Sequence, residues 1–303
     1  IEDKPWFEAV RIIDESEDPR DVMQEVLAPF DLKAKQIAIE DHAWAETILA
    51  FQSLLPGAGW VMASELIAPM RMIKEDVELD LMRKSGQICE AAFQAALDRL
   101  KLGVTAWEVE CEIDYQLLRM GADFNSFPTS VVFSNPGTDP CQSLRKAERR
   151  LEPGEAVTFD FGCLYPGYAS DFGRTAYAGE PSAEYVRMHD LVLGAQRAGM
   201  EALRAGQITG AQADLAARTV IEKGGYGSTF SHRLGHGIGV TVHEPPWLDV
   251  VEDRVLQAGM TFTVEPSIRI PGGYENRVED VVLVTEEGGV SLYRADRQLY
   301  IVG

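Results

Sequence analysis

The chain has 303 residues, with 28 Lys or Arg against 48 Asp or Glu, and so a formal net charge of −20. This acidity argues against nucleic acid or an anionic membrane as a main partner. Its composition, 46% hydrophobic and 25% charged, is that of a folded protein with one large domain or two smaller ones. The longest apolar runs fall far short of the roughly 18–20 residues of a membrane-spanning helix, so we expect a soluble protein.

The four cysteines are scattered without a C-x-x-C pair: Cys89, Cys111, Cys141 and Cys163. This spacing argues against a disulfide framework or a cysteine-held zinc, and it favours a reducing compartment such as the cytoplasm. Residues 1–10 lack the basic and then apolar layout of a signal peptide. The chain starts at Ile1 rather than Met, so the sequence leaves open whether residues precede it.

Residues 1–72 mix charged turns with a helix expected near 42–55. From residue 73 to about residue 103, apolar side chains recur at helical spacing and predict a long helix. We therefore place a domain boundary near residue 73. It separates a short or partial N-terminal domain, residues 1–72, from a larger domain, residues 73–303.

Thr105 and Glu108 form a capping box that begins a second helix, ending near Met120. The same layout recurs after helix 183–204, where Thr209 precedes helix 211–222. Two helices followed by strands, used twice, predict an internally duplicated α+β domain. Strands are expected at 126–133, 156–163, 168–178, 239–242, 261–270 and 277–285, and their short turns favour antiparallel hairpins covered by the helices.

The first of these hairpins brings two acids together. The segment 157–163 alternates apolar and small or polar residues, so one face of the strand is core. Closing the turn over residues 164–167 pairs Asp160 with Asp171, and like charges directly opposite, with Cβ atoms about 4.5–5.5 Å apart, are destabilising. The residues around the pair are small and leave space for a bound cation.

A second hairpin repeats this arrangement. Its loop is Pro271-Gly272-Gly273, and counting back from the loop pairs Ser267 with Arg277 and Glu265 with Glu279. Any single acid is most simply a solvated surface residue. Two opposed pairs within apolar strands indicate that the four carboxylates converge at one site. There the two acids of each pair would repel each other by roughly 4 kcal/mol at about 4 Å and an effective dielectric near 20. Two divalent ions would cancel the four charges.

Three of the five histidines fall in one glycine-rich segment: His232, His236 and His243. An isolated histidine is most often structural, which is our expectation for His42 and His189. Three histidines within twelve residues, beside two acid pairs, indicate contact with a metal or a substrate. A neutral imidazole with four carboxylates suits Mn²⁺, Co²⁺, Fe²⁺ or Zn²⁺.

These residues resemble the pita-bread metallopeptidases, the family of Xaa-Pro dipeptidase (prolidase), aminopeptidase P and methionine aminopeptidase, with metal-free creatinase as a relative. The resemblance covers about residues 73–303 and implies the pita-bread α+β fold. It also implies two divalent ions, most simply Mn²⁺, held by five ligands: Asp160, Asp171, His236, Glu265 and Glu279. By this resemblance Asp171 and Glu279 bridge the ions, Asp160 completes one site, and His236 with Glu265 completes the other.

The same resemblance implies roles for three further residues. His232 is similar to a substrate-pocket histidine, His243 to one near the scissile bond, and Arg277 to a substrate-site arginine. The leading hypothesis is metal-assisted hydrolysis of the Xaa-Pro bond in dipeptides or short peptides. In it Glu265 carries the proton to the leaving nitrogen and His243 stabilises the oxyanion. Because the family is often dimeric, a homodimer is expected.

The sequence departs from the family pattern at three points. Cys141 stands at or next to a position where proline-directed members carry a histidine, Gly173 replaces a threonine, and the N-terminal domain is short. The first departure motivates an alternative, a creatinase-like or ectoine-hydrolase-like C–N hydrolase of a small non-peptide substrate. A third reading is a non-catalytic module that binds a peptide. The retained ligand set argues against both, because creatinase-like chemistry needs no metal and a binding surface gains nothing from opposed buried acids.

Overall fold

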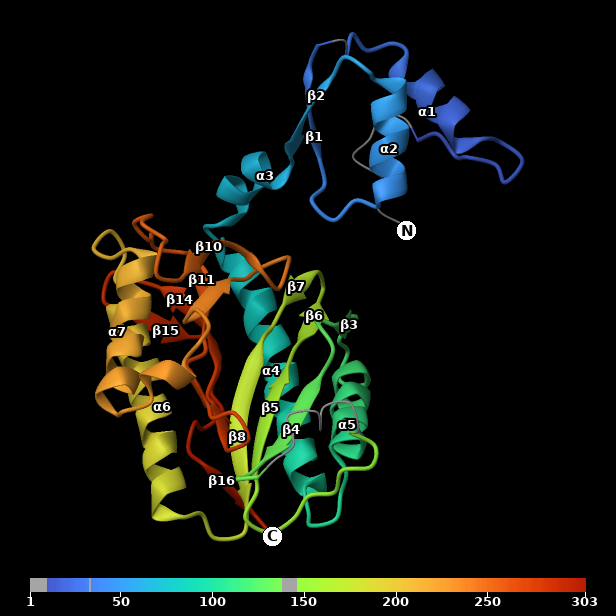
Figure 1. Ribbon diagram of the computed structural model, residues 1–303. Helices are drawn as coiled ribbons and strands as arrows, with labels where there is room; N and C mark the ends of the chain where they lie inside the picture. The colour runs from blue at the N-terminus through green and yellow to red at the C-terminus, as the bar shows by residue number, and fades with distance from the viewer. Residues whose placement is uncertain (1–9, 33, 138–145) are drawn as a thin grey trace. The chain divides into compact units, whose positions relative to one another are not determined.

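The computed structural model describes residues 10–32, 34–137 and 146–303. The chain divides into two compact units, residues 1–70 and 71–303 (Figure 1). The division falls at the last residue of helix α3 (Ser64–Arg71), slightly before the boundary near residue 73 that the sequence suggested. Among the described residues, no helix combines the length and apolar character needed to cross a membrane.

The first unit is small and built around two parallel strands. β1 (Gln36–Ile39) pairs with β2 (Gly59–Met62), and helices α1 (Pro19–Leu27) and α2 (Ala45–Leu54) accompany them. Asp18 starts α1 by accepting a hydrogen bond from the Arg20 backbone N–H. The helix predicted near 42–55 is observed as α2.

The second unit begins with two helices and a run of strands. The long predicted helix is α4 (Asp76–Arg99). α5 (Ala106–Arg119) follows the predicted capping box, in which the Glu108 N–H donates to Thr105 Oγ1 at 3.1 Å and the Thr105 N–H donates to Glu108 Oε2 at 2.8 Å. The strands that follow are β3 (Phe124–Asn125), β4 (Ser130–Ser134), β5 (Ala156–Phe161), β6 (Cys163–Tyr165), β7 (Tyr168–Ala169) and β8 (Phe172–Ala178).

The same order of elements follows in the second half of this unit. Helix α6 (Ala183–Ala202) precedes α7 (Gly210–Lys223), which starts with a capping box between Thr209 and Gln212. The remaining elements are η2 (Gly227–Thr229), β9 (Gly235–Gly237), β10 (Glu244–Leu248), β11 (Thr261–Val264), β12 (Ser267–Arg269), β13 (Glu275–Arg277), β14 (Asp280–Val284), β15 (Gly289–Ser291) and β16 (Tyr300–Val302). The duplicated α+β layout expected from the sequence is confirmed.

Two main sheets form the centre of this unit. One has the strand order β16-β8-β5-β4 and the other β10-β9-β11-β14-β15, and β16 is parallel to β8 while the other neighbours are antiparallel. α4 and α5 pack together beside the first sheet, and α6 and α7 pack together on the other side of the unit (Figure 1). Aromatic rings fill the space under α4, where Phe93 lies 5.2 Å from Phe159 and 5.3 Å from Phe172 between ring centroids. Each such side chain contributes about 1.5–3 kcal/mol by burial.

The predicted register of the first acid hairpin is wrong by two residues. The structure pairs Tyr165 with Tyr168, and it places Asp160 opposite Gly173 rather than opposite Asp171. Gly167 has a φ of 78°, which permits a two-residue turn in place of the four-residue turn assumed. A shift of two residues keeps side chains on the same face of the sheet, so the two acids remain neighbours along a diagonal.

The second hairpin has the predicted register, although several predicted strands near it differ from those observed, among them 277–285, which is divided between β13 and β14. Ser267 pairs with Arg277, and the Ile270 N–H donates to the Tyr274 carbonyl across the three-residue loop. The predicted strand 261–270 is divided into β11 and β12 around Pro266, which has no N–H to donate. The strand predicted at 239–242 is wrong, because these residues form the connection between β9 and β10.

Candidate metal centre

Two hairpins carry the four acids that were expected to converge. Asp160 lies on β5 and Asp171 directly before β8, while Glu265 follows β11 and Glu279 precedes β14. A bridge joins the two hairpins, because the Glu279 N–H donates to the Gly173 carbonyl at 3.0 Å and the reverse bond is 3.4 Å. This bridge brings the carboxylates of Asp171 and Glu279 into one buried cluster.

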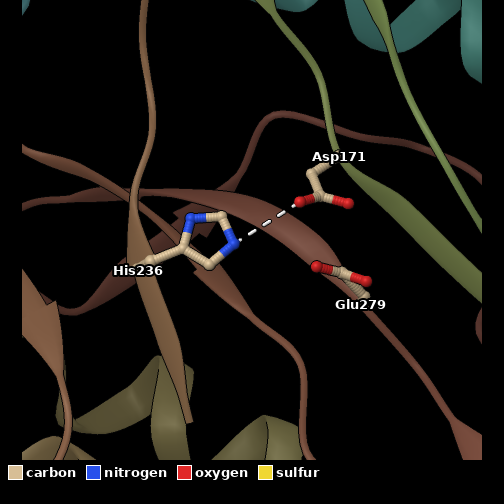
Figure 2. A group of neighbouring side chains, drawn as sticks. All are labelled: Asp171, His236 and Glu279. Atoms are coloured by element: carbon tan, nitrogen blue, oxygen red, sulfur yellow. Dashed lines mark ion pairs between the residues drawn. The ribbon is translucent and has the colours of Figure 1, made fainter. Parts of the chain in front are cut away.

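His236 completes the most compact part of the cluster. Ligand atoms of Asp171, His236 and Glu279 lie within 4.8 Å of one another, and all three residues are buried (Figure 2). His236 Nε2 lies 3.5 Å from Asp171 Oδ2 and 3.4 Å from Glu265 Oε1. His236 Nδ1 lies 3.1 Å from the Gly237 carbonyl oxygen, which favours a proton on Nδ1 and leaves the Nε2 lone pair for a metal.

The glycines beside His236 are required by close strand packing. A Cβ on Gly235 would lie 1.8 Å from the Thr263 carbonyl oxygen, and one on Gly237 would lie 2.4 Å from the Glu244 carbonyl oxygen. β9 therefore fits between β10 and β11 only with small residues on both sides of His236. The glycine-rich pattern in the sequence reflects this packing.

The donor set fits a divalent cation. Asp171 Oδ1 and Glu279 Oε2 are buried and have no hydrogen-bond partner in the described part of the chain. Burial is the largest cause that raises the pKa of both carboxyls; the neighbouring carboxylates raise the pKa of Glu279 further, whereas His236 acts in the opposite direction on Asp171. A buried polar atom without a partner is costly, and a mixed oxygen and nitrogen set suits Mn²⁺, Co²⁺, Fe²⁺ or Zn²⁺.

Arg277 places a positive charge among the acids. Its Nη1 pairs with Asp160 Oδ2 and lies 3.5 Å from Glu265 Oε2 and 3.7 Å from Glu279 Oε2. Burial raises the pKa of Asp160 to about 7, although Arg277 acts in the opposite direction. Burial also acts to raise the pKa of Glu265, but the charges of Arg277 and His236 outweigh it and lower that pKa. Glu265 is therefore the most readily ionised of the acids whose pKa is shifted here.

The two further histidines of the glycine-rich segment differ in exposure. His232 Nε2 lies 2.6 Å from Ser267 Oγ and its Nδ1 lies 2.7 Å from the Arg233 carbonyl oxygen. Burial lowers the pKa of His232, so its ring is neutral and both nitrogens are engaged. His243 is exposed, and its ring centroid lies 4.2 Å from that of His236. The structure thus brings His243 directly beside the metal-ligand cluster.

The sequence departures fall in two different regions. Cys141 lies outside the described residues. Gly173 faces the cluster, where a Cβ would lie 2.8 Å from Glu279 Cβ and 3.2 Å from Arg277 Cδ. The absence of a side chain at Gly173 therefore leaves room for both of these residues.

The sequence reasoning missed a buried ion cluster behind His243. Glu244 accepts hydrogen bonds from Lys74 and Arg71 at 2.6 Å each. The partners are far apart along the chain, so no spacing pattern could reveal them. The available signal was an acid directly after His243 and before two prolines. His189 lies apart from the metal cluster, buried between Asn276 and the Arg297 carbonyl.

Comparisons with known proteins extend these observations. Residues 80–286 match the model of metallopeptidase family M24. The Xaa-Pro dipeptidase of Lactobacillus helveticus is 35% identical, over 90% of this chain and 77% of that protein. Among curated relatives, this chain spans 78% of a dipeptidase of Bacillus subtilis and 64% of one of Mycobacterium tuberculosis.

Solved structures show the same similarity in three dimensions. The dipeptidase of Pyrococcus horikoshii superposes with a TM-score of 0.87 at 33% identity, over 95% of this chain and 79% of that one. The X-Pro aminopeptidase of Thermotoga maritima gives a TM-score of 0.82 at 30% identity, over 95% and 81%. The pita-bread α+β fold expected from the sequence is thereby confirmed.

Proposed function

This chain belongs to metallopeptidase family M24, and we propose that it hydrolyses the Xaa-Pro bond in dipeptides or short peptides. The buried cluster of Asp171, His236 and Glu279 carries this proposal, because it offers a divalent ion three converging ligand atoms. Relatives that match most of the chain are named Xaa-Pro dipeptidase, prolidase and X-Pro aminopeptidase. These names support a proline-directed peptidase over the C–N hydrolase that the sequence left open.

Five side chains would hold two divalent ions: Asp160, Asp171, His236, Glu265 and Glu279. Asp171 and Glu279 suit bridging positions, because each has a buried oxygen without a partner in the described chain. Divalent ions bound at such a site polarise a carbonyl group and lower the pKa of water. Mn²⁺ is our first choice, and Co²⁺, Fe²⁺ and Zn²⁺ share the same ligand preference.

We assign proton transfer to Glu265. Its lowered pKa keeps the carboxylate ionised at neutral pH, so it can accept a proton from the attacking water. Thr263 Oγ1 donates a 3.1 Å hydrogen bond to Glu265 Oε1 and orients this carboxylate. Glu265 then returns the proton to the nitrogen of the breaking bond, because proline must leave as an amine.

Three further side chains would act on the substrate or on its surroundings. His243, exposed beside His236, would donate a hydrogen bond to the substrate carbonyl oxygen as that oxygen gains negative charge. Arg277 orients Asp160 through their ion pair. Both ring nitrogens of His232 are engaged by Ser267 and the Arg233 carbonyl, so we assign its ring to lining the substrate pocket rather than to proton transfer.

Cleavage assays on Xaa-Pro dipeptides and Xaa-Pro-Xaa tripeptides test the proposed function. Chelator-treated protein is assayed with and without each of the four metals, and Xaa-Leu dipeptides of equal length serve as controls. Metal-dependent cleavage confined to the proline peptides is the expected result. The ratio of dipeptide to tripeptide turnover then distinguishes a prolidase from an aminopeptidase P. Absence of cleavage with all four metals would contradict the proposal and favour the C–N hydrolase.

Three finer proposals accompany this one: manganese as the resident metal, a homodimer and a cytoplasmic location. The mixed ligand set supports manganese, and the absence of a C-x-x-C pair supports a reducing compartment. The homodimer rests on the family resemblance alone. Metal analysis of the purified protein tests the assignment of manganese, and light scattering tests the homodimer.

A further inference from the structure

Glu244 lies at the centre of a buried ion cluster beneath the loop that carries His243. Its Oε1 accepts a 2.6 Å hydrogen bond from Lys74 Nζ, and its Oε2 accepts one of 2.6 Å from Arg71 Nη2. The side chains of Lys74 and Glu244 are only 3% and 7% exposed. Desolvation offsets much of the attraction in such a pair, so its net contribution to stability is small. The main effect of the ion pair is therefore to fix the position of the Glu244 side chain and of the backbone next to it.

The loop between β9 and β10 is folded around this carboxylate. A Cβ on Gly239 would lie 2.8 Å from both Glu244 Oε1 and Lys74 Cε, so the loop backbone passes directly over the ion pair. Thr241 Oγ1 lies 3.2 Å from Glu244 Oε2 and also accepts a 3.2 Å hydrogen bond from Arg71 Nη2. The path of the loop thus depends on the charged cluster below it.

His243 has little else to orient its ring. Within the residues that the structure describes, no hydrogen bond reaches its ring nitrogens, and its ring contact is with His236. Its backbone is held on both sides, because Thr241 Oγ1 donates to the His243 carbonyl at 3.3 Å and Glu244 pairs with Gly237 across β9 and β10. The position of the imidazole is therefore set through the backbone that Glu244 anchors.

We propose that Glu244, held by Lys74 and Arg71, is a positioning residue that fixes His243 against the metal-ligand cluster. The inference rests on the proposed function, which assigns His243 to the substrate carbonyl oxygen. Glu244 acts only through His243. Loss of its charge loosens the loop, misplaces the imidazole and lowers kcat, whereas KM changes little because the hydrogen bond from His243 strengthens only as the substrate oxygen gains charge.

A double-mutant cycle tests this inference. Glu244→Gln keeps the size of the side chain and is expected to lower kcat on an Xaa-Pro dipeptide by about 10- to 100-fold, the effect of a small misplacement. In a His243→Ala background the same substitution should cause no further loss, because its target is already absent. Lys74→Met should lower kcat as Glu244→Gln does, and Lys74→Arg should retain most of it. Glu112→Gln, which breaks the ion pair with Arg99, is the matched control and should leave kcat unchanged.

The outcomes separate this inference from the proposed function. Equal losses of kcat in both backgrounds, or an unchanged kcat in Glu244→Gln, would overturn the positioning role and leave the peptidase proposal standing. Lack of Xaa-Pro cleavage by the unmodified protein would instead refute the peptidase proposal. The modification rate of His243 by diethyl pyrocarbonate, mapped by mass spectrometry, needs no substrate. It should rise in Glu244→Gln and Lys74→Met, and an unchanged rate in both would overturn the positioning role.

Discussion

Substituting Arg174 by methionine removes a buried charge that joins the two halves of the second unit. Arg174 is 0% exposed and donates a 2.7 Å hydrogen bond to Asp280 Oδ1. It also donates to four backbone carbonyl oxygens, at 2.7–3.1 Å: those of Gly173, Glu279, Ala295 and Asp296. Methionine has a similar length but no donor, so the variant isolates the loss of these bonds.

The expected cost follows from the uncompensated groups that remain. Removing one partner of a buried ion pair costs about 3–5 kcal/mol of unfolding free energy. Asp280 keeps Ser291 and Arg297 as partners, so the ion pair itself should cost about 3 kcal/mol. Three of the four abandoned carbonyls keep another donor, and the fourth, that of Ala295, adds about 1–2 kcal/mol, which brings the total to about 4–5 kcal/mol. For a unit of this size the melting temperature should fall by about 8–20 °C.

Urea unfolding of the metal-free protein, followed by circular dichroism, measures this cost without a contribution from metal binding. Arg269→Met is the matched control, because Arg269 pairs with Glu275 from a side chain that is 56% exposed. Its loss should cost less than about 1 kcal/mol. If Arg174→Met also costs less than about 1 kcal/mol, the reasoning that this buried pair holds the two halves together is refuted.

Three other predictions concern the metal centre and pH. Gly173→Ala should weaken Mn²⁺ binding, measured by calorimetry, about 10- to 100-fold, because the added Cβ would displace Glu279. Gly194→Ala is the control and should leave the affinity unchanged, because its Cβ would lie 3.4 Å from the nearest atom. Equal Mn²⁺ affinities of the two variants would contradict this prediction. Glu265→Ala should abolish turnover with an unchanged circular dichroism spectrum, and retained activity would exclude the proposed proton transfer. Burial lowers the pKa of His189, so below about pH 6.5 its imidazole is protonated in the unfolded chain and stays neutral in the folded one. The free energy of unfolding should therefore decline as pH falls below about 6.5. His189→Gln should lessen this decline between pH 8 and pH 5.5, and an identical slope in urea titrations would rule out His189 as its source.

The two acid hairpins show where sequence reasoning succeeds. For the second hairpin, the short loop Pro271-Gly272-Gly273 determines the register, so the positions of Glu265 and Glu279 follow by counting. For the first hairpin, the turn could close over two or four residues, and the choice depends on the backbone conformation of Gly167. Alternation still placed both aspartates on the correct face, because a register error of two residues preserves it.

Other features depend on contacts between distant parts of the chain. Lys74 meets Glu244, and Arg174 meets the backbone at Glu279, only after the sheets have formed. The segment 239–242 has strand-forming residues, but it closes the connection between β9 and β10 around the Lys74 pair. Such tertiary contacts override local propensity and leave no periodic signal in the sequence.

An anomalous diffraction experiment on crystals soaked in Mn²⁺ tests whether the five predicted ligands bind two metal ions. We expect two adjacent peaks within the cluster formed by Asp171, His236 and Glu279, with Asp160 and Glu265 completing the ligand set. Absence of a peak at this cluster, or peaks only at sites away from these five side chains, would contradict this expectation.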